Sequence, residues 1–154
     1  MDTTDVIEIV TNKLDRLAAT GQLARSGYAP LNVITRDNAG AVHVQPFPRA
    51  HLEEVMDYLM FYLQEKRKNI QEVFLVTDCY TDPTLGTTLS DVVVIVHCRA
   101  DNKVRIGLIE YDPHSNPLLK KEVNWTNPHW HQHMSALGLT LSRQLSENTP
   151  ETVG

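Results

Sequence analysis

The strongest constraint on the fold is a run of five aliphatic residues, VVVIV, at positions 92–96. All five are β-branched, and β-branched side chains favour strands over helices. A run without polar alternation is typical of a strand that is buried on both faces. Strand-like segments flank it at 72–80 and 103–111. We therefore expect a central strand at 91–99, with other elements covering both faces of its sheet.

The remaining elements follow from periodicity and turn residues. Apolar residues recur at helical spacing in three segments, and these are 4–19, 48–68 and about 128–146. A hairpin is indicated where short β-branched runs flank a cluster of turn residues, and its strands are 31–36 and 41–47. We expect a loop at 22–30 and a further edge strand at 118–125.

This order predicts a single-domain α+β fold. The expected sheet is mainly antiparallel and has five to six strands with helices packed on it, in the order α-β-β-α-β-β-β-(β)-α. The chain has 154 residues, which fits one domain. We assign that domain to 1–146 and expect 147–154 to be a flexible C-terminal tail.

Composition narrows the function classes. The chain holds 14 Lys and Arg against 19 Asp and Glu, for a net charge of -5, so a nucleic-acid partner is not expected. Its start is acidic, and no apolar run approaches the ~20 residues of a membrane span, so no membrane association is expected. Two cysteines, Cys79 and Cys98, are too few for a disulfide scaffold. These features together indicate a cytoplasmic protein with reduced thiols.

The middle of the predicted helix 48–68 is apolar or aromatic on all sides. Its core stripe is already complete without Tyr58, Phe61 and Tyr62. Because aromatic side chains are enriched at protein interfaces, these three are the candidate interface residues. They predict a homodimer, or a surface that binds another protein.

The second candidate site depends on strand register. A two-residue hairpin loop closed by Ala100 and Lys103 places Val93 opposite Glu110. The same register places Asp91 opposite Asp112. If Tyr80 and Ser90 flank the preceding link, Asp78 lies opposite Val92 and beside Asp91.

Under that register, Asp78, Asp91 and Asp112 gather at one end of the sheet, and Asp82 and His114 lie in the adjoining loops. Clustered carboxylates raise one another's pKa and suit a divalent cation, a basic partner or acid–base chemistry. The alternative is that they are ordinary turn residues at strand ends.

Two histidines form a weaker metal candidate. His129 and His133 are four residues apart at the start of the last predicted helix, on one face. Two ligands are half a metal site. The alternative is a solvent-exposed helix start, so no metal site is assigned to them.

The sequence contains no phosphate-binding glycine loop, dinucleotide fingerprint or serine-nucleophile elbow. The main hypothesis is a small cytosolic, non-enzymatic binding or regulatory domain that forms a homodimer and needs no cofactor. The alternative is a metal-assisted enzyme that uses the carboxylate cluster. A third hypothesis is an acidic inhibitor or decoy of a basic partner surface.

Overall fold

A computed structural model describes residues 3–47, 52–65, 69–80, 89, 91–100, 103–126 and 132–148. It confirms the single-domain α+β fold and the predicted order of elements. The helices are α1 (Thr4–Ala19), α2 (Gln22–Ser26), α3 (Leu52–Glu65) and α4 (Gln132–Asn148). The strands are β1 (Leu31–Asp37), β2 (Val42–Phe47), β3 (Ile70–Tyr80), β4 (Asp91–Arg99), β5 (Lys103–Asp112), β6 (Leu119–Lys120) and β7 (Asn124–Thr126).

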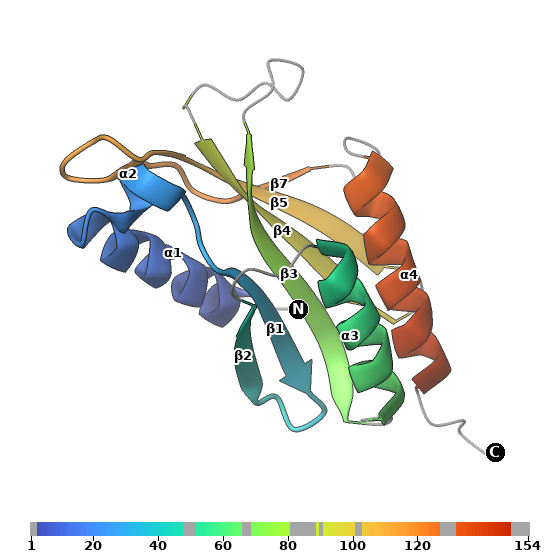
Figure 1. Cartoon of the computed structure of the whole chain (residues 1–154). Coiled ribbons are helices and arrows are strands. Elements are labelled where there is room, and N and C mark those ends of the chain that lie inside the picture. The colour runs from blue at the N-terminus through green and yellow to red at the C-terminus, as the bar shows by residue number, and fades with distance from the viewer. Residues whose placement is uncertain are drawn as a thin grey trace.

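All strand pairs are antiparallel, and the sheet has the order β2-β1-β3-β4-β5-β6, with β7 also paired to β5. The aliphatic strand β4 is therefore central, as its composition predicts. Helices α1 and α2 lie on one side of the sheet, and α3 and α4 lie on the other (Figure 1).

Each face of the sheet carries its own apolar core, because side chains alternate along each strand. On the first face, Val93 and Ile95 of β4 pack against α1. On the second face, Val94 and Val96 pack against α3 and α4. Seven consecutive residues of β4, from Val92 to Cys98, are buried, which explains why its sequence lacks polar alternation.

The register of both central hairpins differs by one residue from our expectation. Val93 lies opposite Ile109 rather than Glu110, and Asp91 lies opposite Tyr111 rather than Asp112. Arg99 pairs with Lys103, so three residues rather than two connect these strands. The observed register keeps the side chains of each core on one face, which is what fixes register in a buried sheet.

The β3–β4 hairpin shows the same shift. Asp78 lies opposite Val93 instead of Val92. Cys79 lies opposite Val92, and Cys98 lies opposite Val73, so the cysteines are separated by six positions or roughly 20 Å along the sheet. Both cysteines are free thiols, as their expected separation already required.

Two local elements also differ from the expectation. The segment predicted as a loop at 22–30 contains the five-residue helix α2, and the edge strand predicted at 118–125 is divided into β6 and β7. The first helix is preceded by Thr3, which makes no side-chain capping bond. None of the helices in the described ranges combines the length and apolar content that a membrane span requires.

Candidate functional site

The outer face of α3 carries the aromatic residues predicted to form an interface. Val55, Leu59 and Leu63 form the buried stripe of this helix. Phe61 follows Leu59 by two residues, which turns it about 200° around the helix and away from the core. Phe61 is 63% exposed and Tyr58 is 41% exposed, whereas Tyr62 is half-buried against the core.

The three aromatic side chains, which we call the aromatic face, are anchored at one side. The ring of Tyr58 lies edge-on to Phe47 of β2, with centroids 5.3 Å apart. It also stacks on Tyr62 at 6.2 Å. Because Phe61 takes no part in these ring contacts, it is the member of the aromatic face that is most available to another molecule.

Carboxylates surround this face along the helix. Glu53, Glu54, Asp57 and Glu65 are all exposed, and we call them the acidic rim. Asp57 and Glu65 lie one turn before and one turn after Phe61, on the same side of the helix. Helix α3 contains no Lys, Arg or His over its whole length. Within the described residues 52–65, the outer surface of this helix therefore combines an apolar centre with exposed carboxylates, and Lys66, Arg67 and Lys68 follow directly in the sequence.

A second candidate site is a cavity where α2 approaches the ends of β3 and β4. Its volume is about 510 Å³, and its lining includes Arg25, Asp78, Asp91 and His114. The corrected register explains why two carboxylates meet there. Asp91 pairs with Tyr80, and residues 78 and 80 share one face of β3, so Asp78 and Asp91 lie on the same side of the sheet.

Asp78 is held inside this cavity by specific contacts. The Tyr111 hydroxyl donates a hydrogen bond of 2.7 Å to its carboxylate. A Cβ at Gly27, where φ is +65°, would collide with the same carboxylate. Burial raises the pKa of Asp78 to about 6 against the effect of the Tyr111 bond, and the charge of Asp91 adds to the rise. Asp78 therefore changes protonation near neutral pH.

The other members of the predicted acidic cluster are placed differently. Asp112 accepts a hydrogen bond from the backbone N–H of His114 at 3.0 Å, which is the turn-forming alternative for this residue. Because Tyr111 shares the face of Asp91, the next residue, Asp112, belongs to the opposite face. Asp82 lies outside the described residues.

The structure does not test the two histidines predicted as weak metal candidates. His129 lies outside the described residues, and the side chain of His133 is also outside them. In the part of the chain that the structure describes, no group of three or more His, Cys, Asp or Glu residues could hold a metal ion.

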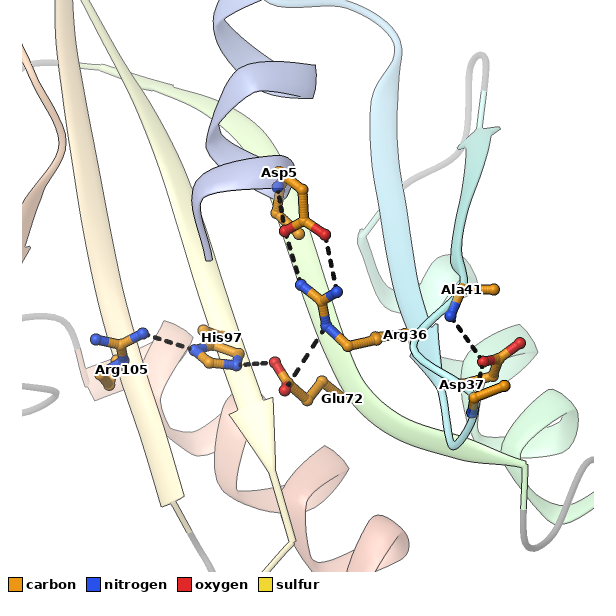
Figure 2. Close-up of polar contacts among 9 residues, drawn as sticks. Asp5, Arg36, Asp37, Ala41, Glu72, His97 and Arg105 are labelled. Atoms are coloured by element: carbon orange, nitrogen blue, oxygen red, sulfur yellow. Dashed lines mark hydrogen bonds and ion pairs between the residues drawn. The ribbon is translucent and has the colours of Figure 1, made fainter. Parts of the chain in front are cut away.

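Sequence reasoning missed a buried charge network on the α1 face (Figure 2). Glu72 is 0% exposed and His97 is 1% exposed. His97 Nε2 lies 2.7 Å from Glu72 Oε2, and Arg105 donates to His97 Nδ1 at 3.2 Å. Because arginine only donates, Nδ1 must accept, and Nε2 therefore carries the proton that is donated to Glu72.

Arg36 extends this network to the first helix. Its guanidinium donates two hydrogen bonds of 2.8 Å to Asp5, and its Nε lies 3.8 Å from Glu72 Oε1. Asp5 thus ties α1 to β1. The alternation of side chains along each strand could have revealed the buried pair. Glu72 lies on the same face of β3 as the core residue Phe74, and His97 lies on the same face of β4 as the core residue Ile95.

Burial and the neighbouring charges shift the pKa values of His97 and Glu72, the two central groups of the network. Burial lowers the pKa of His97, against the effect of Glu72. Burial alone would raise the pKa of Glu72, but the hydrogen bond from His97 and the charges of His97, Arg36 and Arg99 hold that pKa below its usual range. His97 also stacks on the ring of Phe74 at 4.2 Å. A pair this deeply buried cannot touch a substrate, so we interpret it as structural.

A second buried polar cluster lies under the same helix. Lys13 donates hydrogen bonds to the Pro30 carbonyl at 2.6 Å and to Asn32 Oδ1 at 2.9 Å. The hydroxyl of Tyr28 also donates to Asn32. Burial, together with the charge of Arg16, lowers the pKa of Lys13 to about 8. These contacts join α1 to the segment that enters β1.

Comparison with protein-family models, with curated proteins and with solved structures found no match to this chain. No activity is therefore transferred from a relative, and the function is argued from the two candidate sites themselves.

Proposed function

We propose that this protein is a small non-enzymatic binding domain that docks a protein partner on the outer face of α3. The observation that carries the proposal is the exposure of Phe61, a large aromatic side chain that is 63% exposed. Buried aromatic anchors supply much of the binding energy at protein interfaces. Tyr58 and the half-buried Tyr62 widen the same apolar surface.

A homodimer remains one form of this proposal. The same surface of a second copy would cover Phe61 if two chains met about a twofold axis. A separate protein would cover it equally well.

The Asp78 cavity supports a second candidate, a cation-assisted enzyme. Asp78, Asp91 and His114 line a cavity of about 510 Å³, and burial raises the pKa of Asp78 to about 6, which suits acid–base chemistry. Thermal melts with and without Mg²⁺ or Ca²⁺ test this candidate. A stabilisation that is lost in Asp91→Asn would favour it over the binding domain.

The binding proposal is tested by replacing Phe61 and a matched exposed residue. The matched residue is Leu119, which is 54% exposed on β6, at the end of the sheet away from β2. A photo-crosslinking amino acid placed at position 61 should give a discrete adduct, with a second copy in the purified protein or with a partner in cells. The same amino acid at position 119 should give none.

The stability of Phe61→Ser separates a binding role from a structural one. Because Phe61 is largely exposed, its removal should change the free energy of unfolding by no more than about 0.5 kcal/mol, as is usual for surface positions. A loss above about 2 kcal/mol would mean that Phe61 supports the fold. Such a loss, or the absence of any adduct at position 61, would contradict the binding proposal.

A further inference from the structure

We propose that the Asp78 carboxyl group is a proton-controlled latch, which holds the corner formed by α2 and Gly27 against the sheet when it is protonated and releases that corner when it ionises. The corner forms one wall of the cavity of about 510 Å³ described above, so its release would widen the cavity. This inference concerns the side of the sheet that carries α1 and α2, and it is independent of the docking surface on α3 (Figure 1).

Little buried surface holds α2 in place. This helix has five residues, of which only Leu23 is buried, and a helix this short is not stable by itself. Gly21 and Gly27, at its two ends, have positive φ angles of 77° and 65°, a conformation that glycine adopts without strain. Because short segments with few buried contacts open locally at a low free-energy cost, α2 can move as a unit between these two glycines.

Asp78 of β3 contacts the corner directly. The backbone N–H of Tyr28, the residue after Gly27, donates a hydrogen bond to its carboxyl group. Gly27 lies so close to Asp78 Oδ2 that an added Cβ would collide with it, and Tyr111 of β5 donates its hydroxyl to Asp78 Oδ1. The carboxyl group is therefore enclosed between the corner and the sheet, and movement of α2 away from the sheet exposes it to water.

The charged groups around Asp78 come from several elements. Asp91 of β4 lies on the same side of the sheet, and its charge adds to the effect of burial in opposing the ionisation of Asp78. Arg25 of α2 and His114, after β5, also line the cavity. Among the described residues, neither of these two forms an ion pair with Asp78. Lys13 of α1 is bound to other acceptors, so no cation compensates Asp78 within the described part of the chain.

Protonation and closure are coupled because the carboxyl group has different surroundings in the closed and the open corner. In the closed corner, burial raises the pKa of Asp78 from 3.8 to about 6. In the open corner the group is hydrated and returns toward its ordinary pKa. The closed state therefore binds the proton more tightly, so the fraction of open corners rises with pH and levels off above about 6.

The two pKa values also limit the size of the effect. They allow at most about a hundredfold change in the opening equilibrium, and partial hydration of the closed carboxyl group reduces this change to about tenfold. Tyr80, whose side chain lies outside the described residues, does not confuse this range, because tyrosine ordinarily ionises near pH 10.

Amide hydrogen exchange of the full-length chain, followed by nuclear magnetic resonance, measures the opening. The N–H of Gly27 donates to the Leu23 carbonyl at 2.9 Å, and that of Tyr28 donates to Asp78, so both exchange when the corner opens. Rates are recorded between about pH 4.5 and 7.5 in EDTA and divided by the rates of an unstructured peptide at the same pH. The N–H of Ile95, in the central strand, reports global unfolding.

Three variants identify the group that titrates. Asp78→Asn keeps the shape of the side chain and an acceptor oxygen, but it cannot ionise. Asp91→Asn removes the charge that opposes ionisation, so the rise in exchange should begin at lower pH and be smaller. His114→Gln is the control, because histidine ordinarily titrates in the same pH range, and it should leave the pH dependence unchanged.

We expect the normalised exchange of Gly27 and Tyr28 to rise by about tenfold across this pH range in the parent chain, and by less than about twofold in Asp78→Asn. The exchange of Ile95 should not follow this rise. The latch is overturned if the two amides exchange equally at both ends of the range, if Ile95 rises in parallel with them, if the pH dependence persists in Asp78→Asn, or if His114→Gln abolishes it.

A carbon-13 titration of the Asp78 carboxyl group in the parent chain keeps the proposal testable if Asp78→Asn does not fold. The midpoint should lie near pH 6 and should fall in Asp91→Asn. A midpoint near the ordinary value of 3.8 would mean that closure does not oppose ionisation, and would overturn the latch.

Discussion

Replacing Glu72 by Gln should destabilise the protein far more than replacing Asp5, the exposed carboxylate of the same network, by Asn. The substitution keeps the size of the side chain and leaves an oxygen to accept from His97. It removes the charge that compensates Arg36, whose side chain is only 11% exposed. Glu72→Gln therefore tests whether the buried charge itself stabilises the fold.

The expected magnitude follows from the two contacts that change. A charge-assisted hydrogen bond contributes about 1.5–3 kcal/mol, against about 0.5–1.5 for a neutral one, so the His97 bond should lose about 1 kcal/mol. Breaking a buried ion pair by removing one partner costs up to about 3–5 kcal/mol. Because Asp5 still binds Arg36, we expect a total loss of about 2–4 kcal/mol in the free energy of unfolding.

Urea denaturation at pH 7.5 measures this loss, with Asp5→Asn as the control. Asp5 is half exposed, and its ion pair with Arg36 should be worth at most about 1 kcal/mol. The m-values of both variants should match that of the parent chain. If Glu72→Gln costs no more than Asp5→Asn, the buried network does not stabilise the fold.

The pH dependence of the stability difference between Glu72→Gln and the parent chain provides an independent test. The pKa of Glu72 is held below its ordinary value of 4.5, so its contribution is present above that value and is lost as the pH falls through the native pKa. The difference between Glu72→Gln and the parent chain should therefore shrink below about pH 4.5. A difference that grows on acidification would contradict the ionised state assigned to Glu72.

Three further predictions concern the Asp78 cavity and the cysteines. Asp78→Asn should stabilise the protein by about 1–2 kcal/mol at pH 8, after the raised pKa is discounted for partial exposure, and by less at pH 5 in urea melts. This sign follows because the native carboxyl keeps its proton up to about pH 6, and that contribution is lost as the pH rises through 6. Gly27→Ala should destabilise the protein by more than about 2 kcal/mol in the same assay, because the added Cβ collides with Asp78 and the backbone is strained. Gly40→Ala is the control: its φ is +88° but the space around it is open, so it should cost only about 1–2 kcal/mol. Cys98 is fully buried, and burial raises its thiol pKa, so a thiol reagent should modify Cys79 first in the native protein; equal rates would contradict this burial.

Much of the fold could be predicted because burial leaves a periodic trace in sequence. The VVVIV run placed β4 at the centre of the sheet, and helical spacing placed α1 and α3. Register could not be predicted, since it depends on whether Lys103 pairs with Ala100 across a two-residue loop or with Arg99 across three residues, as it does in the structure. The short helix α2 has only one buried residue, Leu23, and so gives no periodic signal.

The candidate sites differ in how well the sequence reveals them. Phe61 stood out because the helix already had a complete apolar stripe without it. The shared cavity of Asp78 and Asp91 depends on register, and the expected register would have placed these two carboxylates on opposite faces. The Arg36–Asp5 pair joins residues 31 positions apart, and no local pattern predicts such a contact.

The most direct test of the proposed docking surface is a titration of isotope-labelled protein with the molecule that crosslinks at position 61, either unlabelled copies of this chain or the partner protein, followed by nuclear magnetic resonance. We predict that chemical-shift changes concentrate on the exposed positions of α3, around Asp57, Tyr58, Phe61 and Glu65. The backbone of α1, on the other side of the sheet (Figure 1), should be unaffected. Changes that concentrate around Asp78 and His114, with α3 unperturbed, would contradict the account and place binding in the cavity instead.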